Sequence, residues 1–490
     1  MRFLTVLFFL CIVQLGSAQN RFYKLFSGTG FDKGEDVLAL PDSTFMVAGS
    51  SGSWEANAQG FLMKLDQQGN YVWSQAYGAQ ETEEIKRVFH RPGMGYYLAG
   101  MSNSWSGGAY EPMLVYTDLN GHQQWIKTYP SAGWGRIHDG VMTADTGFVL
   151  VGERQAQLGG SSDVLLLRLN KFGDTLWTKT IGGSGDDRAH SILRIQDTLF
   201  AVGGEWTLQD SMVRKGFVCL FNEQGNVVWF DTLGVAAGDH AVLDLTQTPF
   251  GIQFAGYRKI SPTNHDKFSG MIALDGSITA QNAPIDGAMI SDDIIQQIAY
   301  VQQLDACAQG IQVQNQGTYP EPYDLNIGYG DALFGYWLGW PVTTILNQGY
   351  DHCGNIKPTL DGGFIAVGMN SVIVDGQNQL NGGSNIFVLK VNGDGSAYVQ
   401  TDTVFTTNQL VGLTPASAPE KLLIHPNPAQ TKVQLSWPST APKQIAVYNA
   451  IGTLVLRQEL NSNQTIDLQD WPSGLYLLRI EGATYPIVKY

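Results

Sequence analysis

The run Phe148-Val149-Leu150-Val151-Gly152 is an apolar stretch that ends in glycine, and copies of it organise the chain. Similar runs recur at intervals of 51 to 53 residues and end at Gly49, Gly100, Gly152, Gly203 and Gly256. The run returns as Phe364-Ile365-Ala366-Val367-Gly368, after a degenerate copy at Ala306-Cys307-Ala308-Gln309-Gly310. A fixed period of this length predicts one supersecondary unit that is repeated along the chain.

A second pattern, Gly-x-x-x-Trp, runs in phase with the first. It occurs at Gly69/Trp73, Gly121/Trp125, Gly173/Trp177 and Gly225/Trp229, so the tryptophans are 52 residues apart. With a turn whose glycine accepts positive φ, each repeat reads as four short strands. Four strands per period are typical of a propeller blade, and the copies predict seven blades. We expect the regularly spaced tryptophans to wedge one blade against the next.

The start of the chain carries an orphan copy of a fourth strand. Phe22-Tyr23-Lys24-Leu25-Phe26 resembles Trp177-Thr178-Lys179-Thr180-Ile181, and both precede a glycine-rich turn. Such a strand can complete the last blade and close the ring, which removes open sheet edges. The segment 397–404 could also be the outer strand of that blade, so the latch is doubled or the blade has five strands.

Composition and the first residues restrict the compartment and the partners. There are 29 Lys+Arg against 44 Asp+Glu, a net charge of −15, which disfavours nucleic acid as a partner. Arg2, the apolar stretch 3–15 and the small residues 16–18 predict a signal peptide at 1–18. No later apolar run reaches the length of a transmembrane helix. Of the three remaining cysteines, Cys307 and Cys353 either form a disulfide or are buried thiols like Cys219.

The C-terminal part of the chain has a different pattern. Residues 406–419 are rich in Thr, Pro, Ala and Ser and read as a linker. Residues 420–490 alternate apolar and polar residues in short strands, which predicts a small β-sandwich. The expected fold is therefore all-β: a seven-bladed β-propeller at 19–405, followed by a small Ig-like β-sandwich. By its pattern alone the sandwich could be a carbohydrate-binding or structural module.

Five motif elements of this C-terminal part occur in a family order. They are Ile424-His425-Pro426-Asn427-Pro428, Val447-Tyr448 through Gly452, Ile466-Asp467-Leu468, Pro472 through Gly474-Leu475-Tyr476, and Val488-Lys489. Together they resemble the type A C-terminal sorting domain of the type IX secretion system of Bacteroidota. The resemblance implies passage through the outer membrane, removal of the domain by a sortase-like peptidase, and release or attachment to surface lipopolysaccharide. The repeats are similar to those of secreted propellers of the same bacteria, which implies the fold and no activity.

Two sets of loop residues are candidates for ligand binding on one face of the propeller. Trp54, Trp105, Trp134 and Trp206 lie in expected loops of this face, and aromatic rings stack on the apolar faces of sugars. They form a glycan platform, or they fold back as lids over the blade cores. Carboxylates form an expected acidic girdle on the same face: Asp32, Glu83, Glu84, Asp139, Asp186, Asp187, Asp239, Asp292, Asp293 and Asp351. Asp186, Asp187, Asp292 and Asp293 could bind Ca²⁺, whereas the alternative has the girdle capping turns.

No catalytic motif is present in the sequence. There is no zinc-binding histidine pair, no Gly-x-Ser-x-Gly elbow and no phosphate-binding loop. We therefore expect no enzymatic activity and no obligatory cofactor. The expected function is a secreted or surface-attached binding or adhesion propeller whose partners are the type IX machinery and a glycan or surface protein. A polysaccharide-active hydrolase or lyase and a structural surface component are the alternatives, because a catalytic carboxylate pair is not readable from sequence.

Overall fold

The computed structural model divides into two units, Met1–Gly412 and Leu413–Tyr490, which are described separately. The described residues are 21–489 except 29, 54–56, 131–132, 156–158, 210–212, 235–237, 262–263, 283–292, 315–322, 332–342, 346–350, 372–383, 393–403, 408–422, 426–428, 438–441, 450–452, 463 and 481–482. The predicted signal peptide at 1–18 and most of the predicted linker lie outside them.

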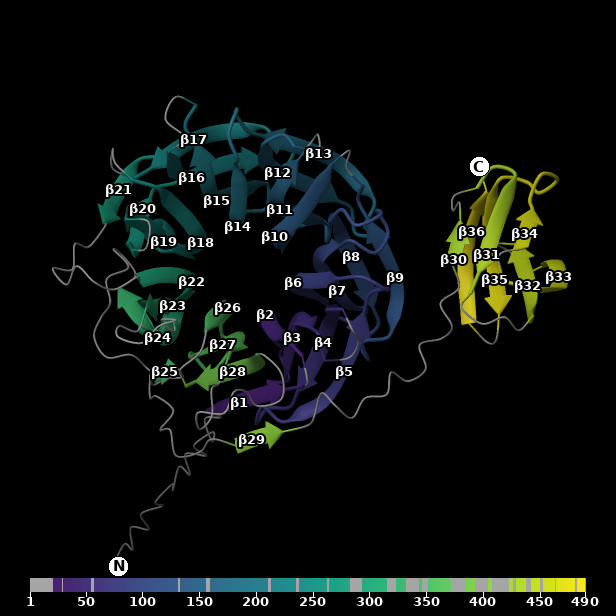
Figure 1. Cartoon of the computed structure of the whole chain (residues 1–490), viewed down its shortest axis with the longest axis horizontal. Helices are drawn as coiled ribbons and strands as arrows, with labels where there is room; N and C mark the ends of the chain where they lie inside the picture. Colours follow the sequence, from purple (N-terminus) through teal and green to yellow (C-terminus); the bar gives the residue numbers. More distant parts are fainter. Residues whose placement is uncertain are drawn as a thin grey trace, which may run out of the picture. The chain divides into compact units, whose positions relative to one another are not determined.

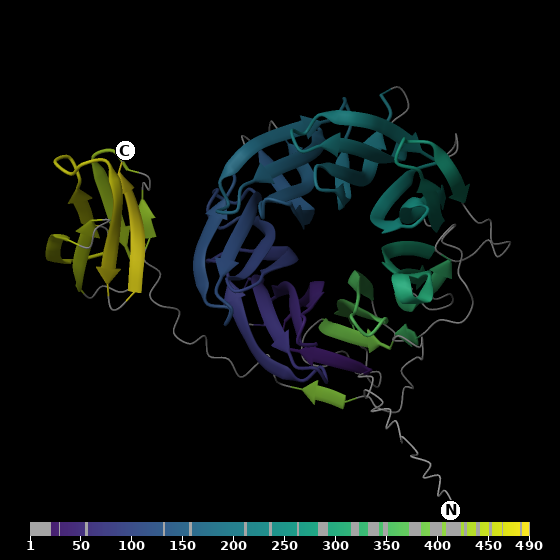
Figure 2. The same cartoon turned by 180° about the vertical axis from the view of Figure 1, so that it is seen from behind.

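The first unit is a ring of antiparallel sheets, and Figures 1 and 2 show it from its two sides. In the described residues there are six four-stranded sheets and one five-stranded sheet, which we call blades 1 to 7. The first strand of each blade lies nearest the centre of the ring (Figure 1). The propeller predicted from the repeats is therefore present.

The blades follow one another in chain order. Blade 1 contains β2 (Asp32–Ala39), β3 (Phe45–Ser51), β4 (Gln59–Leu65) and β5 (Tyr71–Tyr77). Blade 2 contains β6 (Glu83–Arg91), β7 (Gly95–Ser102), β8 (Glu111–Thr117) and β9 (Gln123–Thr128). Blade 3 contains β10 (Trp134–Met142), β11 (Phe148–Gln155), β12 (Ser162–Leu169) and β13 (Thr175–Ile181). Blade 4 contains β14 (Arg188–Gln196), β15 (Leu199–Thr207), β16 (Arg214–Asn222) and β17 (Val227–Leu233).

The later blades keep this order until the ring closes. Blade 5 contains β18 (His240–Thr248), β19 (Gly251–Ser261), β20 (Asn264–Ile272) and β21 (Ile278–Asn282). Blade 6 contains β22 (Asp293–Val301), the short 3₁₀ helix η1 (Gln302–Leu304), β23 (Ala306–Gln314), β24 (Tyr323–Asp331) and β25 (Thr343–Ile345). Blade 7 contains β26 (His352–Pro358), β27 (Phe364–Asn370), β28 (Asn385–Val391), β1 (Phe22–Ser27) and β29 (Val404–Thr407).

Both ends of the first unit close blade 7. β1 pairs antiparallel with β28, from Phe22 opposite Lys390 to Phe26 opposite Ile386. β29 then pairs in parallel with the other edge of β1. The N-terminal latch is therefore confirmed, and the blade has five strands. Thr406 and Thr407, which the sequence assigned to the linker, instead belong to β29 because they pair with Phe26 and Ser27.

The fourth-strand tryptophans pack against the turn glycines of the following blade. A Cβ atom at Gly173, whose φ is +77°, would lie 2.8 Å from the Trp125 ring. The same relation joins Trp73 to Gly121, Trp177 to Gly225 and Trp229 to Gly276. Glycine is therefore required for its positive φ and for the close approach of the ring, and the predicted wedge between blades is confirmed.

The innermost strands carry a repeated β-bulge that the sequence analysis missed. In all seven blades the register between the first and second strands shifts at the same point, between Gly34 and Asp36 in blade 1 for example. A bulge re-aims the side chain that follows it. The residues at or just after the bulge form a polar belt: Asp36, Arg87, Asp139, Ser191, Asp244, Gln296 and Asn355.

The polar belt joins each blade to the next around the whole ring. Its bonds are Val88 N to Asp36 (2.9 Å), Arg87 Nε to Asp139, Ile192 N to Asp139 (2.8 Å), Ser191 Oγ to Asp244 (2.8 Å), Ile298 N to Asp244 (2.9 Å), Cys353 N to Gln296 (2.7 Å) and Asn355 Nδ2 to Asp36 (2.8 Å). Buried polar groups are tolerated when they are paired in this way. The last bond links blade 7 to blade 1, so the belt closes together with the sheet.

The second unit consists of two sheets over one core. One sheet has the order β30 (Leu423–His425), β31 (Lys432–Ser436), β34 (Gln464–Asp467). The other has the order β33 (Leu454–Leu460), β32 (Lys443–Asn449), β35 (Gly474–Ile480), β36 (Ala483–Lys489). One buried cluster includes Val433 and Ile466 from the first sheet and Val447 and Leu478 from the second. This is the expected two-sheet arrangement, while its likeness to immunoglobulin domains stays a prediction.

Two further observations concern the cysteines and the membrane. Cys219, Cys307 and Cys353 are buried and form no disulfide, so the disulfide alternative for Cys307 and Cys353 is wrong. Burial raises the pKa of Cys219 to about 12. Helices of the length and apolarity needed to span a bilayer do not occur among the described residues.

Candidate functional site

The described carboxylates of the acidic girdle are mostly occupied in capping turns. Asp187 accepts hydrogen bonds from Gly183 N and Thr207 N, both at 2.7 Å. Asp186 accepts one from Ser162 N at 2.9 Å, and Glu83 accepts one from Ala79 N at 3.1 Å. Asp293 lies 3.6 Å from the Lys267 ammonium, and Asp292 lies outside the described residues. Within the described residues, no group of three or more His, Cys, Asp or Glu side chains could hold a metal ion.

The three loop tryptophans that the structure describes do not share one environment. Trp206 packs edge-on against Phe230 and Phe217, with ring centroids 4.8 and 6.3 Å away, so it is a lid over the core of blade 4. Trp105 is 37% exposed in the loop between β7 and β8. Trp134 begins β10, and Trp54 lies outside the described residues. Trp206 thus follows the lid alternative in its packing, while glycan binding by the loop tryptophans stays a prediction.

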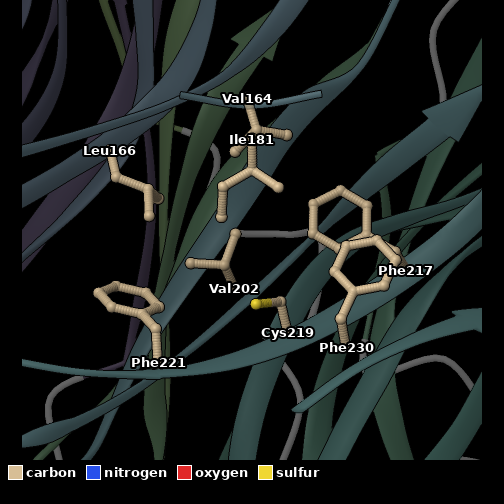
Figure 3. A pocket seen from close by; sticks show the side chains of 8 residues that line it. All are labelled: Val164, Leu166, Ile181, Val202, Phe217, Cys219, Phe221 and Phe230. Carbon is tan, nitrogen blue, oxygen red and sulfur yellow. The ribbon is translucent and has the colours of Figure 1, made fainter. Parts of the chain in front are cut away.

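The core beside Trp206 offers no space for a ligand. Figure 3 shows a gap lined only by apolar side chains and the Cys219 thiol, with Phe217 and Phe230 stacked at one end. The volume open to a water molecule there is about 0 Å³. This gap is therefore a packing feature of blades 3 and 4.

A larger pocket lies between blades 2 and 3. Its volume is about 320 Å³. Blade 2 and the chain that leaves it contribute Pro112, Thr128, Tyr129 and Pro130; blade 3 contributes Gly135, Arg154, Leu165, Leu167, Thr175 and Thr178. Gly135 leaves room here, because a Cβ atom at this position would lie 3.2 Å from the Pro112 ring. The Arg154 Nε atom is buried and has no hydrogen-bond partner among the described residues.

Trp134 precedes Gly135 on β10 and belongs to a stack of aromatic rings and a cation. The Arg136 guanidinium lies 4.9 Å from the Trp134 ring centre and 5.1 Å from that of Tyr110. Gly135, which lines the pocket, lies between Trp134 and Arg136 in β10 and donates to Tyr110 O at 2.8 Å. The stack and the pocket therefore share one stretch of strand.

Arg136 also belongs to a group of charged side chains on the first two strands of blade 3 and the first three strands of blade 4. We call this group the basic cluster: Arg136, His138, Glu153, Arg188, His190, Glu205 and Arg214. Two buried glutamates stand at its centre, with Glu153 on β11 and Glu205 on β15. This cluster was not among the sites predicted from the sequence.

Two arginines and one histidine approach Glu153 at distances longer than a hydrogen bond. The distances from its carboxylate are 3.7 Å to Arg136, 3.8 Å to Arg188 and 3.6 Å to His138. Burial alone would raise the pKa of Glu153, but His138 and the charges of Arg188 and Arg136 lower it. Burial also lowers the pKa of His138, which favours its neutral form.

Glu205 has closer partners. His190 Nε2 lies 3.1 Å from its carboxylate, Arg214 donates at 3.4 Å, and the Tyr257 hydroxyl donates at 3.4 Å. Burial opposes ionisation, but the His190 hydrogen bond and the charges of His190, Arg188 and Arg214 lower the pKa of Glu205 to about 2. Both glutamates are therefore ionised at neutral pH, and the arginines around them keep unused N–H donors.

A sequence signal for this cluster exists in the repeats. Arg136-Ile137-His138 and Arg188-Ala189-His190 are Arg-x-His triplets at the same position of two consecutive blades. Glu153 and Glu205 each follow a glycine near the end of the apolar run. A search for charged residues that recur in phase with the glycines would have found them.

The C-terminal unit matches a known family. Residues 423–489 match the family described as the secretion system C-terminal sorting domain. Of the motif residues, Tyr448 lies on β32, Gly474 and Tyr476 on β35, and Lys489 at the end of β36 opposite Gly474. Pro426, Asn427, Pro428 and Gly452 lie outside the described residues. The chain thus carries a type IX sorting domain, which means export to the cell surface or the medium and contact with the type IX machinery.

Solved structures similar to this chain include several propellers. The WD40 domain of Pan2 from Neurospora crassa is 10% identical, with 75% of this chain and 95% of that chain covered and a TM-score of 0.43. The propeller domain of the trilobed protease from Pyrococcus furiosus is 9% identical, with coverages of 78% and 99% and a TM-score of 0.40. An ulvan lyase of polysaccharide lyase family 25 is 9% identical, with coverages of 76% and 96% and a TM-score of 0.47. No match is found among curated proteins. The assignment of the propeller rests on the sheets described above, and no activity is carried over from these structures.

Proposed function

We propose that this protein acts outside the cell as a non-enzymatic propeller that binds a glycan at the pocket between blades 2 and 3. In this proposal residues 1–18 direct the chain to the periplasm of a member of the Bacteroidota, and the sorting domain then carries it through the outer membrane. Released and surface-attached forms both fit this role.

The observation that carries the proposal is the composition of the pocket. Its 320 Å³ are walled by Pro112, Tyr129, Pro130 and two leucines, with threonine hydroxyls and the Arg154 guanidinium among them. Small-molecule sites combine apolar walls with a few polar groups in this way. A sugar offers both an apolar ring face and a hydroxyl edge, and the ring of Trp134, one position before Gly135 on β10, offers a flat surface on which a further sugar of the same polymer can stack.

The test is a glycan panel applied to the mature chain, residues 19–490, with the melting temperature as the readout. A ligand that binds the folded state at about 100 times its Kd adds about 2.7 kcal/mol of stability. We expect at least one glycan to raise the melting temperature. W134A and R154Q should each weaken that glycan's binding about tenfold, as the loss of one stacking or hydrogen-bonding contact does.

The control variant is F172A. Phe172 is 59% exposed in the turn between β12 and β13 of the same blade and does not line the pocket. It should bind like the unmodified chain, and the unliganded melting temperatures should show that all variants fold. If no glycan raised the melting temperature, or if W134A and R154Q bound as tightly as F172A, the proposal would be wrong.

A polysaccharide-active hydrolase or lyase is the second candidate, favoured by one observation. His190 and Tyr257 both contact the Glu205 carboxylate, and these three residue types serve in general acid–base catalysis. Incubation of the mature chain with the glycan that it binds should release no shorter products. New reducing ends or unsaturated sugars that disappear in E205Q would replace the binding role with an enzymatic one.

A further inference from the structure

We propose that the glycan is acidic and that the basic cluster binds its carboxylate or sulfate groups. This inference rests on the proposed function and names the class of its ligand. It is carried by the hydrogen-bonding capacity of the cluster, by its local charge and by its continuity with the aromatic stack.

The arginines of the cluster have donors to spare. A guanidinium carries five N–H donors in a planar fork that matches carboxylate and sulfate groups. Arg188 stands 3.8 Å from Glu153 and 4.0 Å from Glu205, distances at which the charges attract but no hydrogen bond forms. Its buried Nε atom has no hydrogen-bond partner among the described residues, and the same holds for His138 Nε2. A buried donor without a partner costs free energy, which a turn of the Arg188 side chain toward an anion at its exposed end would recover.

The local charge of the cluster is opposite to that of the chain. The chain as a whole has a net charge of −15. The cluster has three arginines against two ionised glutamates, and it also contains two histidines. The glutamates hold the arginine side chains in place without neutralising all of them. An anionic polymer is therefore repelled by most of this protein and attracted at the cluster, which gives the site its selectivity.

Arg136 connects this cluster to the glycan site. Its guanidinium lies over the Trp134 and Tyr110 rings and also 3.7 Å from Glu153. A sugar stacked on the aromatic rings would thus place its substituents next to the cluster. Polysaccharides that repeat an acidic group along the chain are suited to both surfaces, because one unit can stack while the next meets Arg188 and Arg214.

The accessible arginines make the inference testable. Arg188, Arg136 and Arg214 are partly exposed, with 28%, 43% and 41% of their side-chain surface open to solvent. A polymer can therefore reach them without a rearrangement of the inner strands. The variants R188Q and R214Q remove one charge each and keep a side chain that can still hydrogen bond.

The experiment compares four probes on the mature chain: polygalacturonate, its methyl ester, dextran sulfate and dextran. Affinity is measured by calorimetry at low and at high salt. We expect polygalacturonate or dextran sulfate to bind at least tenfold more tightly than its neutral counterpart, with a preference that shrinks at high salt because charge attraction is screened. The carboxylated and sulfated arms distinguish the two acidic groups.

The variants separate this inference from the function on which it rests. R188Q and R214Q should each lower the affinity for the acidic probe about tenfold and leave neutral glycans unaffected. R194Q is the matched control, since Arg194 lies on the same strand as Arg188 and belongs to no part of the cluster. If neutral glycans bound at the pocket but acidic polymers bound no better and R188Q matched R194Q, the inference would be overturned while the proposed function stood. Absence of binding to every acidic and neutral glycan would overturn both.

Discussion

Substitution of Gly173 by alanine is expected to weaken the packing between blades 2 and 3. The added Cβ atom would lie 2.8 and 3.2 Å from two atoms of the Trp125 ring and 3.3 Å from Leu114, at a φ of +77°. A residue with a Cβ atom in the left-handed region costs about 1–2 kcal/mol. Forcing a side chain into a filled core costs a further 1–3 kcal/mol, approximately. We therefore expect G173A to lower the free energy of unfolding by about 2–5 kcal/mol.

A matched variant separates the two contributions. Gly93 has nearly the same φ, +76°, in the turn between β6 and β7, but an added Cβ atom there would have no neighbour within 4 Å. G93A should therefore cost only the backbone part, about 1–2 kcal/mol. In a W125L background the ring is gone, and G173A should cost no more than G93A does.

The assay is urea unfolding of the mature chain, with the free energy taken from the midpoint and slope of the transition. The double-mutant cycle of G173A and W125L should give a coupling of about 1–3 kcal/mol. If G173A destabilised the protein no more than G93A, or if the cycle showed no coupling, the wedge between the tryptophan and the neighbouring glycine would be refuted.

Three further predictions concern the polar belt, the thiols and export. Burial raises the pKa of Asp244 to about 6, so this group stabilises the fold in its protonated state, and that stability is lost as the pH rises through about 6. The free energy of unfolding, measured in urea, should therefore fall more between pH ~5 and pH ~8 in the unmodified chain than in D244N. Equal decreases in the two proteins would contradict the assignment. Burial also raises the pKa of Cys219 and Cys353, so a thiol reagent should label the three buried cysteines only after denaturation, and rapid labelling of the native protein would show that they are accessible. Deletion of residues 423–489 should leave the chain in the periplasm when fractions are blotted, and its appearance in the medium would argue against export by the sorting domain.

The repeats made the fold predictable from sequence, because each blade presents the same packing problem. The apolar run ending in glycine, the turn glycine and the fourth-strand tryptophan recur together, since the ring of one blade covers the glycine of the next. The orphan strand at 22–26 was recognisable because it copies a fourth strand. β29, which pairs in parallel with the other edge of this strand, extends to Thr407, three residues beyond the predicted end at Val404. A parallel pairing at a sheet edge leaves no turn signature in the sequence, so this end was not predictable.

The candidate site was less predictable, because it depends on where bulges and loops direct side chains. Trp206 looked like a loop aromatic, but β15 extends through it and its ring reaches Phe217 and Phe230. Asp139 looked like a girdle residue, yet the bulge turns it into the polar belt, where it meets Arg87 and the Ile192 amide. The pocket arises from the juxtaposition of blades 2 and 3 around Gly135, which no local pattern records.

The most direct test of the whole account is the binding of the preferred acidic polymer to R136Q. Arg136 belongs to both the aromatic stack and the basic cluster, so it is the residue through which one glycan would use both surfaces. Calorimetry on the mature chain should show that R136Q loses more affinity than either R188Q or W134A while its unliganded melting temperature stays close to that of the unmodified protein. Binding by R136Q as tight as that of the unmodified chain would contradict the account, because the stack and the cluster would then not act on one ligand.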